Sequence, residues 1–173
     1  MQERNIILVG FMGTGKSSAG RLIAERLGLE FIDMDDEITR REGCSIPDIF
    51  RDRGEPAFRA IERDLVVELS NRTGLVISTG GGIVLNPDNI LDFSRKGLVV
   101  CLQASPETVL RRVEKDQNRP LLQGGDRMAK INELLAKRKT LYDAIPAQID
   151  TEGHTPADTA DAVIRHYLTH GQH

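Results

Sequence analysis

The chain has 173 residues, of which 39% are hydrophobic and 28% are charged, as expected for a folded protein with a substantial core. Its formal net charge of -3 excludes a general attraction to nucleic acid or to an anionic membrane surface. No apolar run approaches the roughly 20 residues that span a bilayer, no secretion signal is visible, and the two cysteines form no metal-binding pattern. We therefore expect one domain over residues 1–173, located in the cytoplasm, with no nucleic-acid or membrane partner.

Segments with strand and helix patterns alternate along the chain. The predicted order is strand 6–9, helix 16–27 closed by Gly28, strand 29–32, a helix capped by Ser45, helix 56–71, strand 75–78, a helix between Asn86 and Gly97, strand 98–102, helix 105–113, a mobile loop over about 114–126, helix 127–144, strand 149–150 and a last helix from Pro156 to about His170. This alternation predicts an α/β fold in which helices cover both faces of a parallel sheet. Ligands of such sheets bind beyond the carboxyl ends of the strands.

Residues 10–17 read Gly-Phe-Met-Gly-Thr-Gly-Lys-Ser, which matches the phosphate-loop pattern G-x-x-x-x-G-K-[ST] in full. A strand precedes the motif and a helix follows it, as the motif requires, whereas a plain glycine-rich turn would need neither. Backbone N–H groups of the loop would hold phosphate oxygens, Lys16 would reach the β- and γ-phosphates, and the hydroxyl of Ser17 would bind Mg²⁺. The motif predicts nucleotide binding but leaves the reaction open, because GTPases, motor ATPases and metabolite kinases share it.

Two acids follow the second predicted strand, at Asp33 and Asp35. Alternate residues of a strand face the same side, so we expect both carboxylates to point into one crevice. One would support the Mg²⁺ shell and the other would face an acceptor hydroxyl. The alternative is a structural role, in which Asp35 and Asp36 stabilise the start of the next helix. No acid follows strand 75–78, where many P-loop ATPases and GTPases place one for Mg²⁺, so Asp33 is the candidate for that role.

Three arginines and a run of three glycines are further candidate ligand-binding residues. Arg59, Arg119 and Arg138 could clamp a carboxylate or phosphate, or offset charge on a transferring phosphoryl group. They could equally be solvated surface arginines, and their spacing does not decide between the two. Residues 80–82 are three glycines directly after a strand, which allow close approach of a ligand to the backbone, although a loop tip without a ligand would look the same.

The order and spacing of these motifs resemble the shikimate kinase family over nearly the whole chain. Besides the phosphate loop and the two acids, the matching segments are residues 49–62, 78–82, 119–122 and 138–142. The resemblance implies a P-loop kinase fold with a central five-stranded parallel sheet, a substrate-binding segment at about 34–62 and a mobile lid at about 114–126. It also implies ATP-dependent phosphorylation of the 3-hydroxyl of shikimate, giving shikimate 3-phosphate and ADP on the route to chorismate and the aromatic amino acids. Because no segment typical of subunit assembly is visible, we expect a monomer.

The resemblance also implies a role for each candidate residue. The catalytic residues would be Asp35, Lys16 and Arg119. The ATP-binding residues would be Gly13, Thr14, Gly15, Lys16, Ser17, Ser18, Arg112, Arg119 and Pro156, with Arg112 stacked on adenine. The shikimate-binding residues would be Asp35, Arg59, Gly80, Gly81, Gly82 and Arg138, with both arginines on the carboxylate. One Mg²⁺ per subunit would be held by Ser17 and, through water, by Asp33. Glu62 would orient Arg59.

Several alternatives stay open at this point. Asp35 would act either as a base or only by orienting the acceptor hydroxyl, because two nearby arginines would make it a weaker base. The rival functions are those of another small P-loop kinase, acting on gluconate or a nucleoside monophosphate, and of a nucleotide-dependent switch. The paired arginines, the two acids and the glycine run favour shikimate over those acceptors, and the intact phosphate loop argues against a switch without catalysis. Whether quinate is also accepted is not visible in the sequence.

Overall fold

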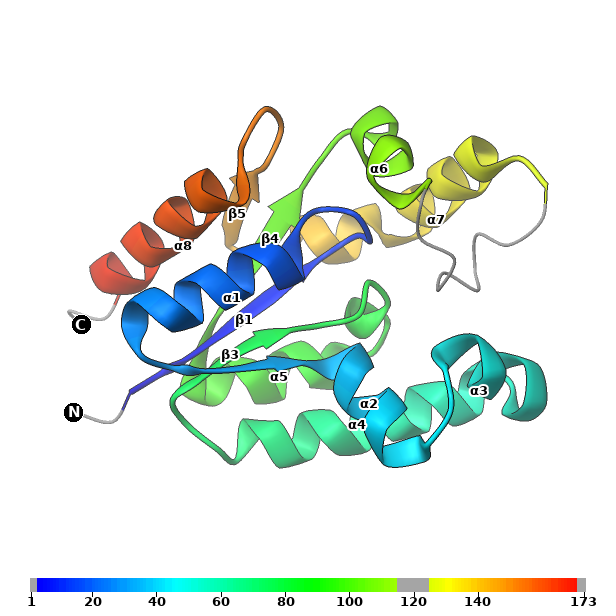
Figure 1. Ribbon diagram of the computed structural model, residues 1–173, viewed down its shortest axis with the longest axis horizontal. Helices are drawn as coiled ribbons and strands as arrows, with labels where there is room; N and C mark the ends of the chain where they lie inside the picture. The colour runs from blue at the N-terminus through cyan, green and yellow to red at the C-terminus, as the bar shows by residue number, and fades with distance from the viewer. Residues whose placement is uncertain (1–2, 115–124, 171–173) are drawn as a thin grey trace.

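The computed structural model describes residues 3–114 and 125–170. Within them, five parallel strands form one sheet in the order β2-β3-β1-β4-β5. The strands are β1 (Asn5–Gly10), β2 (Glu30–Asp33), β3 (Leu75–Ser78), β4 (Gly97–Gln103) and β5 (Ala147–Asp150). Figure 1 shows this sheet at the centre of the molecule with helices on both sides. The predicted α/β fold with a five-stranded parallel sheet is confirmed.

All but the last of the helices connect consecutive strands, as parallel pairing requires. They are α1 (Lys16–Leu27), α2 (Met34–Glu42), α3 (Ile46–Arg53), α4 (Glu55–Ser70), the short 3₁₀ helix η1 (Ile83–Leu85), α5 (Pro87–Lys96), α6 (Pro106–Val113), α7 (Arg127–Asp143) and α8 (Pro156–His170). Side chains cap their first turns where the sequence predicted helix starts: Ser45, Asn86 and Ser105 each accept a hydrogen bond from a backbone N–H two or three residues later. No helix in the described part of the chain is long and apolar enough to cross a membrane.

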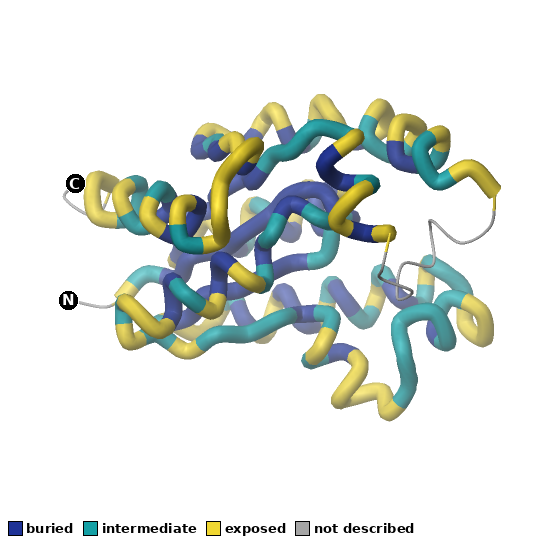
Figure 2. Tube along the Cα trace, turned by 45° about the horizontal axis from the view of Figure 1, so that its top comes forward, coloured by how far each residue is buried: buried dark blue, intermediate teal, exposed yellow. Residues whose placement is uncertain are grey.

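The three central strands β1, β3 and β4 are buried on both faces, because successive side chains of a strand point to opposite sides and helices cover each side. Ile6 of β1 belongs to a cluster with Ile23 of α1 and Val163 of α8. The next residue, Ile7, belongs to the larger cluster on the other face, together with residues of α2 to α7 such as Leu65. In Figure 2 the central strands β1, β3 and β4 are accordingly dark blue, whereas the edge strand β2 is only partly buried, and the helices turn exposed residues outward.

The strand order places three site-bearing turns side by side. β1 ends in the phosphate loop, β2 ends at Asp33, and β3 ends before the glycine turn 80–82. β3 pairs with both β1 and β2, so Ser78 is opposite Leu8 in one register and opposite Asp33 in the other. All strands are parallel, so these three turns open at the same edge of the sheet.

One sequence-based expectation about this edge is wrong. β2 ends at Asp33, and Met34 already begins α2, so Asp35 lies in the first turn of a helix and not on a strand. Asp33 itself is the N-cap of α2 and accepts a hydrogen bond from the backbone N–H of Asp36. Strand alternation therefore does not orient the two carboxylates; the turn from strand to helix does.

Candidate active site

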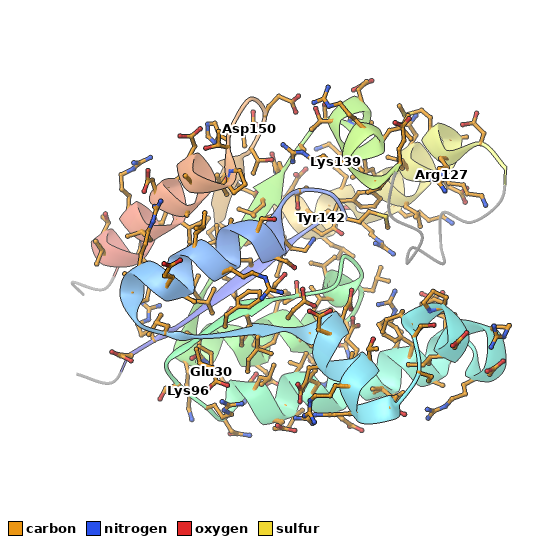
Figure 3. All side chains as sticks on the ribbon, viewed as in Figure 1. Glu30, Lys96, Arg127, Lys139, Tyr142 and Asp150 are labelled. Atoms are coloured by element: carbon orange, nitrogen blue, oxygen red, sulfur yellow. The ribbon has the colours of Figure 1, made fainter. Side chains whose placement is uncertain are left out.

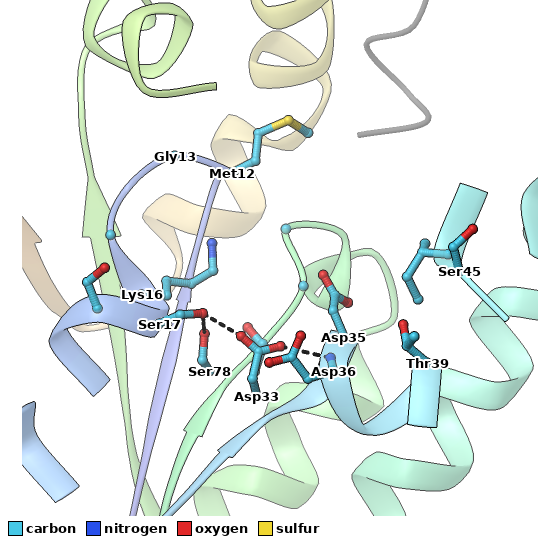
Figure 4. Close-up of a pocket in the computed structure, with 16 residues that line it drawn as sticks. Met12, Gly13, Lys16, Ser17, Asp33, Asp35, Asp36, Thr39, Ser45 and Ser78 are labelled. Atoms are coloured by element: carbon cyan, nitrogen blue, oxygen red, sulfur yellow. Dashed lines mark hydrogen bonds between the residues drawn. The ribbon is translucent and has the colours of Figure 1, made fainter. Parts of the chain in front are cut away.

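The phosphate loop curves tightly between β1 and α1. Gly13 and Gly15 have φ of 74° and 89°, a left-handed conformation that favours glycine, so the motif glycines are needed for the path of the backbone. The ammonium group of Lys16 donates hydrogen bonds to the carbonyls of Gly10 at 2.8 Å and Phe11 at 2.9 Å. Lys16 is 8% exposed and is therefore held against the loop at the start of α1, where phosphate groups bind in such loops (Figure 4).

Three polar side chains from three elements meet beside this loop. The hydroxyl of Ser17 on α1 donates to Oδ2 of Asp33 at 2.5 Å and lies 3.1 Å from the hydroxyl of Ser78 on β3, as the dashed lines in Figure 4 show. Asp33 and Ser78 lie opposite each other where β2 pairs with β3, and this register brings their side chains to the same place. The sequence did not assign a role to Ser78, because a serine at the end of a strand carries no specific signal.

These oxygen atoms fit Mg²⁺ better than a metal ion whose ligands must all come from protein side chains. The described residues contain no group of three His, Cys, Asp or Glu side chains that could hold a metal ion. Mg²⁺ prefers oxygen ligands, keeps several waters and is commonly bound by one or two protein groups together with substrate phosphates. Ser17 and, through water, Asp33 remain the residues that the sequence predicts would hold it.

A cavity of about 410 Å³ opens in front of these groups. It is lined by Met12, Gly13, Gly15, Lys16, Ser17, Ser18, Asp33, Asp35, Asp36, Thr39, Ser45, Ile46, Ser78, Thr79, Gly80 and Gly81. The phosphate loop forms one wall, and α2 with the start of α3 forms the other, so that Lys16 and Asp35 share one space (Figure 4). The cavity therefore joins the predicted phosphate-binding groups to the predicted acceptor-binding acid.

Arg59 and Arg138 are not among the residues that line this cavity; they lie beside the glycine turn. A β carbon placed on Gly81 would be 3.4 Å from Nη1 of Arg138, and one placed on Gly82 would be 2.5 Å from Nη1 of Arg59. Gly82 itself does not line the cavity. Arg59 comes from α4 and Arg138 from α7, so two helices far apart in the chain bring guanidinium groups to adjacent glycines of this turn.

Acidic side chains hold Arg59 in this position. Its guanidinium pairs with Oε1 of Glu62 at 3.1 Å and with Oε1 of Glu55 at 3.1 Å, and Glu62 is the acid that the resemblance implied would orient Arg59. Glu62 is 2% exposed. Burial raises the pKa of Glu62 to about 7, and the positive charge of Arg59 opposes that rise. A β carbon on Gly80 would lie 3.3 Å from both Asp35 and Glu62, so the acids and arginines form one group.

The predicted adenine site forms a second cavity, of about 340 Å³, on the other side of the phosphate loop. Its lining is Gly13, Thr14, Gly15, Ser18, Arg112, Thr151, His154, Pro156 and Thr159. Arg112 donates to the carbonyl of Gly13 at 2.9 Å and contacts the hydroxyl of Thr151 at 3.4 Å. The structure thus brings together the predicted ATP-binding residues of the loop, Arg112 and Pro156. Arg119 and residues 115–124 of the predicted lid lie outside the described residues.

The sequence missed several residues at these sites. Thr151 and His154 come from the turn between β5 and α8, and nothing in their local pattern marks a ligand site. Glu152 in the same turn accepts hydrogen bonds from Ser105, the N-cap of α6, and from Thr108 within α6, and so ties the turn to the helix that carries Arg112. These contacts of Glu152 join residues more than 40 positions apart. The local sequence around either partner therefore does not predict them.

Comparison with known proteins agrees with this geometry. The family model described as shikimate kinase matches residues 12–168. A shikimate kinase of Thermodesulfovibrio yellowstonii is 42% identical over 164 residues, which are 95% of either chain. The solved shikimate kinase from Acinetobacter baumannii in complex with shikimate superposes with a TM-score of 0.94 at 39% identity, over 99% of this chain and 96% of that one. A gluconokinase from Sinorhizobium meliloti 1021 has a TM-score of 0.61 at 17% identity, which shows the shared fold alone. This chain belongs to the shikimate kinase family.

Proposed function

We propose that this chain transfers the γ-phosphoryl group of ATP to the 3-hydroxyl of shikimate, giving shikimate 3-phosphate and ADP. The observation that carries the proposal is that Lys16 and Asp35 line one cavity, and that the glycine turn, of which Gly80 and Gly81 line it, lies against Arg59 and Arg138. A phosphate-binding group and an acceptor-facing acid therefore share one space, and two cations for a carboxylate lie beside it. The similarity to an enzyme solved in complex with shikimate supports the same acceptor.

The two cavities fit the two ends of ATP. Adenine would lie between Arg112 and Pro156, and the phosphates would follow the loop from Gly13 towards Lys16. The ammonium of Lys16 would offset negative charge on the phosphate oxygens and the transferring group. One Mg²⁺, held by Ser17 and through water by Asp33, would neutralise further phosphate charge when bound.

Acceptor chemistry would depend on position more than on proton removal. Phosphoryl transfer passes through a loose transition state, in which the protein contributes mainly alignment and charge stabilisation. The carboxylate of Asp35 would accept a hydrogen bond from the 3-hydroxyl and take its proton as the new bond forms. Arg59 and Arg138 would hold the shikimate carboxylate, and this second anchor would fix the ring relative to the γ-phosphoryl group.

Three further parts of the proposal rest on the sequence alone. Arg119 would close over the phosphates from a lid at about 114–126, and closure would exclude water and suppress ATP hydrolysis. The enzyme would be a monomer and would act in the cytoplasm.

The proposal is tested by ADP formation with Mg-ATP and a panel of acceptors: shikimate, quinate, gluconate, a nucleoside monophosphate and none. Stimulation by shikimate far above the others would support it. Stimulation by gluconate or a nucleoside monophosphate would instead assign a related P-loop kinase activity, and equal ADP release without an acceptor would assign an ATPase or a switch.

A further inference from the structure

Tyr142 is a buried residue of α7 that the proposed reaction does not use directly. It is 5% exposed, and its hydroxyl donates a hydrogen bond to the backbone carbonyl of Gly81. Burial raises the pKa of Tyr142 to about 12, so the hydroxyl stays protonated and remains a donor near neutral pH. Figure 3 labels this side chain on α7. The contact joins α7 to the glycine turn, and its two residues, Tyr142 and Gly81, are 61 positions apart in the chain.

The glycine turn needs such a contact from outside. Gly80, Gly81 and Gly82 have no side chains that could hold their peptide groups, and glycine backbones are conformationally free. Inside the turn, the carbonyls of Gly80 and Gly82 accept hydrogen bonds from Ile83 and Leu85, each at 3.1 Å. The carbonyl of Gly81 is held by Tyr142 instead. The tyrosine hydroxyl therefore fixes the plane of the peptide between Gly81 and Gly82.

That peptide is flanked by both arginines of the proposed carboxylate clamp. Arg138 approaches the Gly81 side, and Arg59 approaches the Gly82 side. Arg138 is also one helix turn before Tyr142 on α7, so their side chains are neighbours. The positive charge of Arg138 opposes the rise in the pKa of Tyr142, as a neighbouring cation does. One hydroxyl thus interacts with Arg138 and with the peptide that borders Arg59.

We propose that Tyr142 is a positioning residue for the acceptor carboxylate: it holds the Gly81–Gly82 peptide between Arg59 and Arg138 and so sets how the two guanidinium groups meet the substrate. Tyr142 acts through these groups and does not itself touch the substrate. The inference rests on the proposed function and adds a determinant of acceptor affinity. The plain structural alternative is that the hydrogen bond only fastens α7 to the turn.

The test replaces Tyr142 by phenylalanine, which keeps the ring in the core and removes the hydroxyl. Tyr167→Phe is a matched control, since the hydroxyl of Tyr167 on α8 also donates to a backbone carbonyl, that of Arg4 at 3.2 Å, away from both cavities. For Tyr142→Phe we expect the KM for shikimate to rise about tenfold, the size of one lost hydrogen bond. The KM for ATP should stay within about twofold of wild type, and Tyr167→Phe should change neither value.

A second acceptor separates positioning from a purely structural effect. The methyl ester of shikimate lacks the carboxylate charge, so its use depends little on how the arginines are arranged. We expect the ratio of kcat/KM for the acid to that for the ester to fall about tenfold in Tyr142→Phe and to be unchanged in Tyr167→Phe. Bound shikimate should also protect Tyr142→Phe less than wild type against thermal unfolding. This comparison of the two proteins does not depend on turnover.

An unchanged acid-to-ester ratio in Tyr142→Phe would overturn the proposal, whatever its thermal stability. So would equal loss of ATP and shikimate affinity, because that pattern indicates general disruption of the site. Failure of the proposed function would look different: wild-type protein itself would not be stimulated by shikimate.

Discussion

The guanidinium of Arg59 occupies the space that a side chain on Gly82 would need, since a β carbon there would lie 2.5 Å from Nη1 of Arg59. The backbone of Gly82 has φ of -88° and ψ of 6°, which other residues also adopt. Glycine at this position is therefore explained by room for Arg59 and not by the path of the chain.

Gly82→Ala should consequently weaken acceptor binding without unfolding the protein. The added methyl group would displace the flexible end of Arg59, and the KM for shikimate should rise about tenfold, as for a misplaced charged hydrogen bond. Steady-state kinetics with shikimate and ATP varied in turn would measure this, with thermal unfolding as the check on the fold.

The matched control for Gly82→Ala is a double-mutant cycle with Arg59→Ala. If the methyl group acts only by moving Arg59, Gly82→Ala should add almost nothing in the Arg59→Ala background. Fully additive effects of the two substitutions would contradict this explanation of Gly82.

Asp33→Asn tests the proposed metal site. Asparagine can still cap α2 through its side-chain oxygen, so the helix that carries Asp35 should stay in place. The lost negative charge should raise the Mg²⁺ concentration for half-maximal rate by about tenfold, within the range found when groups that orient metal ligands are removed. Calorimetric titration of Mg²⁺ with the ADP complex gives a readout apart from turnover. Unchanged Mg²⁺ requirement would remove Asp33 from the site.

Asp35→Asn tests the acceptor side. The amide keeps the shape of the side chain but cannot take a proton, and general acid–base groups contribute typically about 10² to 10⁴ in rate. Because the proposed mechanism relies on alignment more than on proton removal, we expect kcat to fall about tenfold while the KM for ATP changes little. A loss of about 100-fold or more would instead assign proton transfer as the main contribution of Asp35. Near-normal turnover would contradict both roles.

The buried carboxyl of Glu62 predicts a pH dependence of stability. Its pKa is raised by burial from the ordinary 4.5 to about 7, so within that window the folded protein keeps a proton that the unfolded chain has released. The free energy of unfolding should therefore fall as pH rises through this window, by about 1.4 kcal/mol for each unit of pKa difference that is realised. Urea unfolding of wild type and Glu62→Gln at several pH values measures the difference.

Glutamine at position 62 cannot titrate. The free energy of unfolding of Glu62→Gln should therefore not fall with rising pH in this window. Comparing the two proteins at each pH removes the contribution of groups that both share. Parallel pH profiles for wild type and variant would show that Glu62 does not carry the raised pKa.

The parts of the fold that the sequence predicted well are those fixed by local interactions. The helix predicted at 16–27 has the same bounds in α1, because the phosphate-loop motif sets its start and Gly28, with φ of 67°, ends it in the left-handed conformation. The strand at 75–78 is likewise identical to β3, since a fully apolar run between turns has few other solutions. Motif residues in the phosphate loop were assignable for the same reason.

The errors and omissions concern contacts between distant parts of the chain or the competition of two local patterns. An aspartate such as Asp33 is compatible with the end of a strand and with the N-cap of a helix. In the structure it caps α2, so Asp35 lies on that helix and not on a strand. The short helix η1 was not predicted at all. The hydrogen bond from Tyr142 to Gly81 joins α7 to the turn after β3, and neither local sequence indicates it.

The most direct test of the central claim is the structure of the product. Wild-type protein, Mg-ATP and shikimate are incubated, and the mixture is followed by ³¹P NMR with the phosphorus–proton coupling resolved. We predict one new phosphate monoester coupled to the proton on ring carbon 3, formed in equal amount with ADP and slowed together with it by Asp35→Asn. ADP with inorganic phosphate and no monoester, or a monoester at another hydroxyl, would contradict the claim.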